Sequence, residues 1–313
     1  MMKMNYNRIA FVFALAILMF SCEEEYIPKG NAYEKQIVVE SYIEKSSEAY
    51  PVYAIVTYSL PFYSSFGIDV VNNSFVRGAD VSVNDGNKTY QLQEVCLSSL
   101  QEPFKSIVLK SLGFQPDSIK TDICIYADVN REIIPEEGIE YTIKVIKDTD
   151  TLTAFTEIPK LISIDSIWFE KPPGKNQNDT FAQMFCIISD LPGQKDYYRY
   201  YTAGQEEQLV ANVNSVTDDI FFDGQKFKFT LIEARGPDEE FGDNSGLFRR
   251  GDTIQLKWCT LPQSHYEFWN TLETSRTRQG PFASYVRIDG NIANGLGIFG
   301  GQNCSYYTVV VTK

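Results

Sequence analysis

Short runs in which apolar and polar residues alternate recur along most of the chain. Alternation with a period of two predicts strands, and the turns between the runs are rich in Gly, Pro, Asn and Asp. Many short strands at regular spacing are typical of a β-sandwich. The predicted strands are 36–43, 52–58, 141–145, 151–157, 182–188, 197–202, 227–231, 252–259 and 306–312.

The segment 79–92 predicts a β-hairpin. Its Asp85-Gly86 pair suits a two-residue type I′ turn, because Gly accepts a positive φ freely and Asp tolerates one. A turn at this place sets Val81 opposite Tyr90, so that an apolar pair lies on one face, as a half-buried hairpin requires.

One segment instead shows helical spacing and predicts one main helix near 261–276. Thr260 and Gln263 have the spacing of a capping box, and the Gly280-Pro281 pair predicts a firm end to the helix. The recurring positions are Leu261, His265, Phe268, Trp269 and Leu272.

The strand pattern predicts a mainly β protein with two β-sandwich-like domains, 35–160 and 161–313, divided near Pro159. The run that begins at Gly138 resembles the later strands of immunoglobulin- or fibronectin-like and transthyretin-like domains. In the second domain, the polar segments 203–219 and 235–246 are predicted to be exposed loops.

The first residues predict export and a lipid anchor. Residues 1–21 resemble a signal peptide, with two basic residues followed by an apolar run that is shorter than the ~20 residues of a membrane-spanning helix. The run ends at Ser21-Cys22, which resembles a lipoprotein signal, so Cys22 is the predicted site of diacylation with fatty acids such as palmitate. The alternative is an ordinary secretory signal with a chance cysteine.

Residues 22–34 then predict a flexible acidic tether. The acidic run Glu23-Glu24-Glu25 resembles the surface-export signal of Bacteroidota lipoproteins. We therefore expect an outer-membrane protein that is anchored by lipid and faces the cell surface rather than the periplasm.

Charge and cysteine content limit the partners. The formal net charge of −13 repels phosphate backbones, so nucleic acid is not an expected partner. Five cysteines remain beyond Cys22, an odd number, and no C-x-x-C pair suggests zinc. The sequence leaves their disulfide pairing open; they are Cys96, Cys124, Cys186, Cys259 and Cys304.

Candidate chemistry is sparse. His265 is the only histidine and falls on the apolar stripe of the predicted helix, where a packed, hydrogen-bonded imidazole is expected rather than a catalytic one. The acidic residues near Asp238 lack the spacing of an EF-hand loop, so no metal is expected there. No catalytic residue, metal ligand or cofactor is assigned. Four tyrosines surround Arg199, and at least half of them are expected in the core; they are Tyr197, Tyr198, Tyr200 and Tyr201.

Several stretches together resemble a family of Bacteroidota outer-membrane lipoproteins known as domain of unknown function 4249. They are 37–40, 219–227, 250–254, 280–282 and 291–300. The glycines of the last stretch and Gly301 are expected to mark tight turns or close backbone packing rather than a ligand site.

The resemblance implies a cell-surface binding or accessory subunit of a TonB-dependent nutrient uptake system, with the transporter in the same membrane as its partner. A structural or adhesive surface lipoprotein is the second hypothesis. A hydrolase that uses paired carboxylates is the third.

Overall fold

The computed structural model describes most of the chain after residue 33, and the described part forms one compact unit between Lys35 and Lys313. Cys22 and the predicted tether lie outside the described residues, apart from Glu34. Within the described part, no helix is both long and apolar enough to cross a membrane. The described residues are 34–48, 51–61, 68–101, 105, 109, 122–172, 180–204, 208–234, 242, 244–278, 284 and 286–312.

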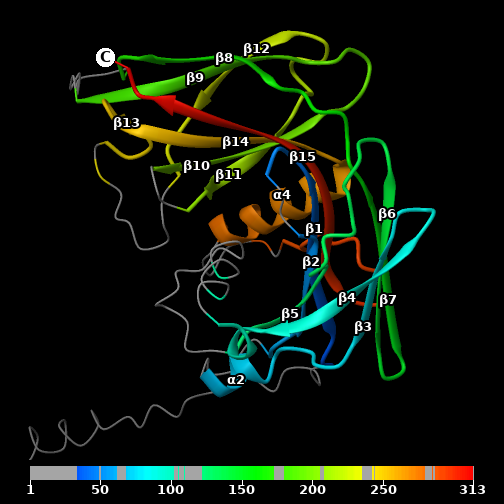
Figure 1. Ribbon diagram of the computed structural model, residues 1–313. Helices are drawn as coiled ribbons and strands as arrows, with labels where there is room; N and C mark the ends of the chain where they lie inside the picture. The colour runs from blue at the N-terminus through cyan, green and yellow to red at the C-terminus, as the bar shows by residue number, and fades with distance from the viewer. Residues whose placement is uncertain are drawn as a thin grey trace, which may run out of the picture. The chain divides into compact units, whose positions relative to one another are not determined.

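The fold is mainly β, as predicted, with two sheets and one main helix (Figure 1). The first sheet has eleven strands in the order β11-β10-β14-β15-β1-β2-β5-β4-β3-β6-β7. Its strands are β1 (Ile37–Lys45), β2 (Tyr53–Tyr58), β3 (Asp80–Asn84), β4 (Thr89–Cys96), β5 (Cys124–Ala127), β6 (Glu140–Lys147), β7 (Asp150–Glu157), β10 (Tyr197–Gly204), β11 (Val210–Asp218), β14 (Thr253–Leu261) and β15 (Leu296–Val310).

The second sheet joins β9 to β12, β13 and β8, all antiparallel. These strands are β8 (Ile164–Glu170), β9 (Phe181–Ser189), β12 (Lys226–Leu231) and β13 (Phe248–Arg249). Among the described residues, the helices with complete bounds are α2 (Ile68–Asn72), the short 3₁₀ helix η1 (Leu97–Ser99) and α4 (Gln263–Thr277).

The first sheet links the two halves of the chain through β1 and β15. These two strands pair in parallel over eight residue pairs, from Val38 opposite Leu296 to Lys45 opposite Asn303. Among the described residues, all other strand pairs of this sheet are antiparallel. Because β15 comes from the last residues and β1 from the first strand, neither half completes this sheet alone.

The sheet also closes on itself at its far edge. Thr153 of β7 forms a bridge with Ala293, just before β15 begins. The Ala293 N–H donates to the Thr153 carbonyl at 2.8 Å, and the Gly301 N–H donates to Thr156 Oγ1 at 2.7 Å. The edge of β7 is therefore covered by the chain that leads into β15.

Two large apolar clusters form the core. One is built mostly from β1 to β7 and includes Phe299 of β15, and the other is built from residues between Ile162 and Val311. The change from one cluster to the other coincides with the Pro159 region. The division of the chain into domains at residue 160 itself stays a prediction.

The predicted hairpin forms between β3 and β4, but its register differs by two residues. Val83, not Val81, lies opposite Tyr90. The Asp85 carboxylate accepts hydrogen bonds from the N–H groups of Asn87 and Lys88 at 2.8 and 2.7 Å, so the Asp85 side chain stabilises the turn. Gly86 has φ +88°, but Asp85, the other residue of the predicted pair, has no positive φ, so the turn is not the predicted type I′. A two-residue shift keeps the predicted face, and Val81 and Val83 are buried.

The predicted helix is α4, but the predicted capping box does not form. Thr260 belongs to β14, and its Oγ1 accepts the Ile162 N–H at 3.0 Å. Pro262 stands at the N-cap position, where no side chain caps the helix. The end of the helix at Thr277 comes before Gly280-Pro281, which lies outside the described residues.

The predicted loop 203–219 is also wrong over most of its length, because residues 210–218 form β11 at the edge of the first sheet. β11 pairs with β10 through a register shift, and Asn214 has φ +63°. Because of this irregularity and the polar composition of the segment, its apolar and polar residues do not alternate as they do in the predicted strands. The other predicted loop, 235–246, lies mostly outside the described residues.

Candidate functional site

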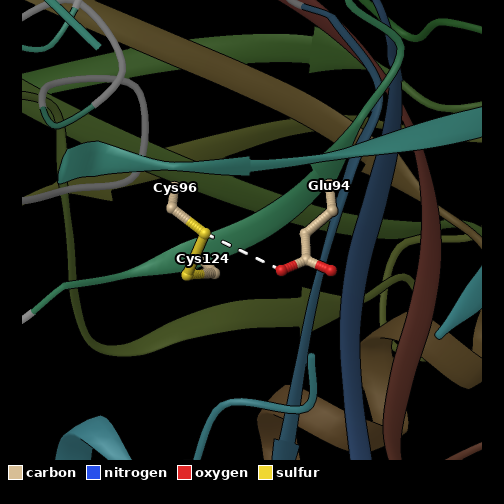
Figure 2. Close-up of side chains that lie close together, drawn as sticks. All are labelled: Glu94, Cys96 and Cys124. Carbon is tan, nitrogen blue, oxygen red and sulfur yellow. Dashed lines mark hydrogen bonds between the residues drawn. A yellow bond between two sulfur atoms is a disulfide. The ribbon is translucent and has the colours of Figure 1, made fainter. Parts of the chain in front are cut away.

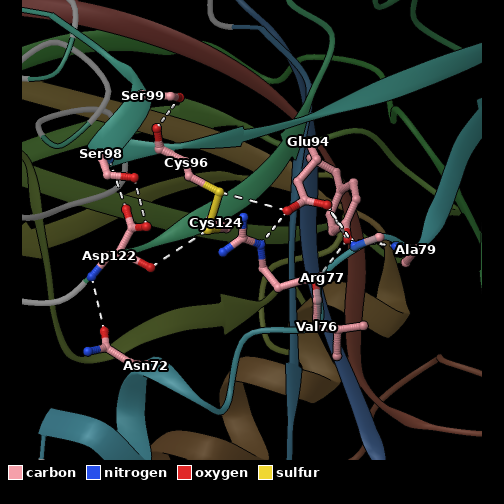
Figure 3. Close-up of a disulfide and its surroundings, with 12 residues drawn as sticks. Asn72, Val76, Arg77, Ala79, Glu94, Cys96, Ser98, Ser99, Asp122 and Cys124 are labelled. Atoms are coloured by element: carbon pink, nitrogen blue, oxygen red, sulfur yellow. Dashed lines mark hydrogen bonds and ion pairs between the residues drawn. A yellow bond between two sulfur atoms is a disulfide. The ribbon is translucent and has the colours of Figure 1, made fainter.

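Three groups of polar side chains have the composition of a functional site. The first lies between helix α4 and the first sheet and contains His265. The second surrounds the Cys96–Cys124 disulfide (Figures 2 and 3). The third joins the loop between β9 and β10 to the loop between β11 and β12 and contains Asp190, Asp196 and Asp219.

His265 is completely buried, as predicted for a packed imidazole. Its Nδ1–H donates to the Gly301 carbonyl at 2.9 Å, which leaves Nε2 as an acceptor without a hydrogen-bond partner among the described residues. Burial lowers the pKa of His265 to about 3, and the nearby Arg199 and Lys257 cations lower it as well. The imidazole is therefore neutral near neutral pH.

Gly300 makes room for this ring. A Cβ at Gly300 would lie 2.9 Å from ring atoms of His265. The helix and β15 therefore approach closely because residue 300 has no side chain. The glycines of the 291–300 stretch act here in packing, as predicted.

Arg199 ties β10 to β11 and α4. Its Nε–H donates to Ser215 Oγ at 2.9 Å, and Ser215 Oγ–H donates to Glu273 at 2.7 Å. The guanidinium lies 3.5 Å from the centre of the Trp269 ring. Arg199 and Glu273 are both nearly buried, so each charge is compensated inside the protein.

A second, partly buried ion pair joins Lys257 of β14 to Glu44 of β1. Glu44 also accepts hydrogen bonds from Tyr306 Oη–H at 2.7 Å and Gln302 Nε2–H at 2.6 Å. The groups beneath α4 thus bring together Arg199 and His265, which the sequence analysis singled out separately. Because these groups form their hydrogen bonds and ion pairs within the protein, the cluster connects the strands of the first sheet to α4.

The tyrosines around Arg199 serve mainly in packing. Tyr198 is completely buried and stacks near Trp258, with ring centres 5.4 Å apart. Tyr197 is also buried and stacks on Tyr266 at 4.7 Å. The expectation that at least half of the four belong to the core is confirmed.

Glu94, Cys96 and Cys124 lie together on β4 and β5 (Figure 2). Cys96 and Cys124 occupy directly opposite positions and form a disulfide, so neither offers a thiolate to a metal. Cys96 Sγ lies 3.8 Å from Glu94 Oε1, but a disulfide sulfur carries no proton to donate. This group therefore does not have the ligands of a metal site.

Glu94 instead holds the chain before β3 in place (Figure 3). Its carboxylate accepts the Gly78 N–H at 2.7 Å and forms an ion pair with Arg77. Tyr126 Oη–H donates to the Val76 carbonyl at 2.8 Å and accepts from the Ala79 N–H. The disulfide and these bonds hold β4, β5 and the chain that enters β3 together.

The second disulfide, Cys259–Cys304, joins directly opposite positions of β14 and β15. Cys186 remains a free, buried thiol, and burial raises its pKa to about 12. A thiol with such a pKa is protonated at neutral pH and is a poor nucleophile.

The third group is a set of buried carboxylates. Ligand oxygens of Asp190, Asp196 and Asp219 all lie within 4.8 Å of one another. Burial raises the pKa of Asp196 to about 6, and the neighbouring carboxylates act in the same direction. Three oxygen donors at this spacing could hold a hard cation such as calcium.

These carboxylates also hold two loops together. Asp219 Oδ2 accepts the Asp196 N–H at 2.9 Å, and Asp190 Oδ2 accepts the Gly224 N–H at 2.8 Å. Asp190 also accepts a hydrogen bond from Tyr198. The loop after β11 is therefore fixed at its base, although it carries two exposed apolar residues at its tip, Ile220 and Phe221.

The model of the family described as Domain of unknown function (DUF4249) matches residues 23–307. The chain belongs to this family. No curated protein and no solved structure matches the chain. The likeness of the first domain to immunoglobulin- or transthyretin-like folds therefore stays a prediction.

Two of the stretches that resemble DUF4249 have clear places in the structure. Stretch 291–300 closes the first sheet against β7 and receives His265. Stretch 219–227 forms the loop with the exposed tip and enters β12.

Cys22 and most of the acidic residues around Asp238 lie outside the described residues of this DUF4249 chain. Sequence reasoning missed the three buried aspartates, because Asp190, Asp196 and Asp219 follow no spacing that marks a site. The only sign of this site in the sequence was that Asp219 stands next to the apolar residues Ile220 and Phe221 within the family-like stretch 219–227.

Proposed function

We propose that this DUF4249 protein is a lipoprotein anchored to the outer membrane through Cys22, that it faces the cell surface, and that it is a binding or accessory subunit of a TonB-dependent nutrient uptake system. The signal-like segment ending at Cys22 and the acidic residues behind it support the anchor and the location. Membership of DUF4249 supports the accessory role, through the likeness of that family to lipoproteins that accompany such transporters.

One observation supports action by contact rather than by acid–base catalysis at His265. The imidazole is buried between α4 and β15, and its pKa of about 3 keeps it neutral at physiological pH. A general acid or base works best with a pKa near the working pH and within reach of a substrate. His265 meets neither condition.

The anchor is tested by Cys22→Ala. Without the thiol no acyl chain can be attached, so the protein should leave the membrane fraction and lose labelling by a fatty-acid analogue. Ser21→Ala is the matched control, because it keeps a small residue before Cys22. Equal membrane association and labelling of the Cys22→Ala protein and the wild type would contradict the anchor.

The partnership is tested by purifying the tagged full chain from native outer membranes in mild detergent. We expect a TonB-dependent transporter to co-purify, and to do so less with Cys22→Ala, because anchoring confines both partners to one surface. If mass spectrometry finds no transporter with the wild type, the accessory role is wrong.

A carboxylate-dependent hydrolase was the third hypothesis from the sequence, and Asp196 favours it. A carboxyl group with a pKa of about 6 beside other carboxylates has the properties of a general acid. Hydrolysis of a panel of chromogenic glycosides by the wild type, lost in a folded Asp196→Asn variant, would support this candidate. No turnover by the wild type would argue against it.

A further inference from the structure

The loop between β11 and β12 carries an unusual pair of side chains. Ile220 is 69 % exposed. Phe221 is 88 % exposed, which is the highest value among the large apolar residues described. A fully solvated Phe gains nothing from the hydrophobic effect in the free protein. Exposed apolar residues that lie side by side mark contact surfaces more often than single ones do.

The loop is held rigidly below this tip. The Phe222 N–H donates to the Asp219 carbonyl at 2.7 Å, and the Phe222 ring is buried against Phe227 with ring centres 4.2 Å apart. Gly224 has φ +68°, and a Cβ there would lie 2.7 Å from Pro192 Cβ. The turn is therefore determined by backbone, core and neighbouring loop together.

Rigidity changes what the exposed pair can do. A side chain presented on a fixed backbone loses little conformational entropy when a partner covers it. Aromatic anchors that enter a pocket dominate the binding energy of many interfaces. Phe221, with Ile220 beside it, has the form of such an anchor.

The charges around Ile220 and Phe221 indicate the charge of the surface that would bind them. The loops 190–196 and 218–223 contain five aspartates and one lysine, Lys195. Lys226 follows the loop and lies 3.9 Å from Asp165. Asp223 and Lys195 are exposed, Asp218 is half-buried, and the other three aspartates are buried below the tip. The summed field of these charges is negative, so the apolar centre has an acidic border that lies partly below the surface. A complementary surface carries Lys or Arg around an apolar pocket.

We propose that Ile220 and Phe221 are a docking anchor that inserts into an apolar pocket bordered by Lys or Arg on a protein partner. The inference rests on the proposed accessory function, where the partner is the transporter, and names the contact. A membrane surface fits less well, because the acidic border is repelled by anionic lipids. A second copy of the chain presents the same acidic border and fits less well for the same reason.

The test places a photo-crosslinking phenylalanine analogue at position 221 of the full chain in native outer membranes. Phe155 is the matched control position, because it is 67 % exposed and belongs to β7. We expect position 221 to crosslink to an outer-membrane protein at an apolar segment flanked by Lys or Arg, and position 155 not to do so. Phe221→Ala should lower the recovered complex by about tenfold or more, and Phe155→Ala should leave it unchanged.

Charge and folding are checked in the same preparations. Asp223→Lys should lower recovery of the complex, because it reverses the border charge. The unfolding temperature of Phe221→Ala should equal that of the wild type, since the side chain is exposed. A loss of complex with unchanged unfolding temperature then reports the contact itself.

The outcomes separate the contact from the function. If the transporter co-purifies equally with Phe221→Ala, the anchor is wrong and the accessory function stands. If position 221 crosslinks instead to another protein at a pocket of the stated kind, the anchor stands and the accessory function is wrong. The anchor is overturned if position 221 captures no protein or a second copy of the chain. Binding to vesicles of phosphatidylethanolamine and phosphatidylglycerol that depends on Phe221 would overturn it in favour of a membrane contact.

Discussion

Replacing Gly301 by Ala tests how the first sheet closes. Gly301 lies where β15 passes β7, and a Cβ there would lie 2.0 Å from the Glu157 carbonyl oxygen and 2.8 Å from its carbon. Carbon–oxygen contacts between strands normally lie at about 3.3–3.6 Å. The two backbones must therefore separate by more than about 1 Å to admit one methyl group.

That separation acts on two hydrogen bonds at once. The Gly301 N–H donates to Thr156 Oγ1 at 2.7 Å, and the Gly301 carbonyl accepts from His265 at 2.9 Å. Overpacking costs about 1–3 kcal/mol, and each lost hydrogen bond adds about 1 kcal/mol. We expect the free energy of unfolding to fall by about 3–5 kcal/mol.

Thermal unfolding of the mature chain in mild detergent, followed by circular dichroism, measures the effect. A loss of this size should lower the unfolding temperature by roughly 10 °C. Gly242→Ala is the matched control, because a Cβ there meets nothing within 4 Å and its φ is not positive. An unfolding temperature for Gly301→Ala close to that of the wild type would refute the closure of the sheet at this point.

Folding raises the pKa of Asp196 from 3.8 to about 6, so the wild type should lose stability as the pH rises through that window. Asp196→Asn should therefore be more stable than the wild type by roughly 2–3 kcal/mol at pH 7 but not at pH 3.5. Urea titrations at the two pH values measure this, and an equal difference in stability at both would contradict the raised pKa. Gly86→Pro should cost about 2–4 kcal/mol in the same assay, because proline cannot adopt the φ of +88° and the N–H that donates to Asn84 is lost; a variant as stable as the wild type would show that the turn tolerates a negative φ.

Several features of the fold could be predicted from local pattern. The alternation in 141–145 and 151–157 indicated β6 and β7, and the helical spacing around His265 indicated α4. The hairpin at Gly86 was found with the correct buried face but the wrong register. Periodicity identifies the buried side of an element, and a two-residue shift leaves that side unchanged.

The candidate groups were predicted less completely. The sequence indicated that His265 packs in the interior, but its contacts with Gly300 and Gly301 needed β15 beside α4. The predicted loop 203–219 became mostly strand β11, because pairing with β10 outweighed its polar composition. The turn chemistry of Asp85 moved the hairpin because its carboxylate caps two N–H groups, which a residue pattern alone does not show.

The sequence by itself determined the strand-rich class, the main helix, the family and the signal-like segment ending at Cys22. Tertiary structure alone decided that β1 pairs in parallel with β15, that Cys96 meets Cys124, and that three aspartates meet beneath an exposed Phe221. The physical reason is that local pattern reflects the burial and backbone preference of each segment. The choice of partner among many similar strands depends instead on how all of them pack together, and residues far apart in the chain carry no local sign of it.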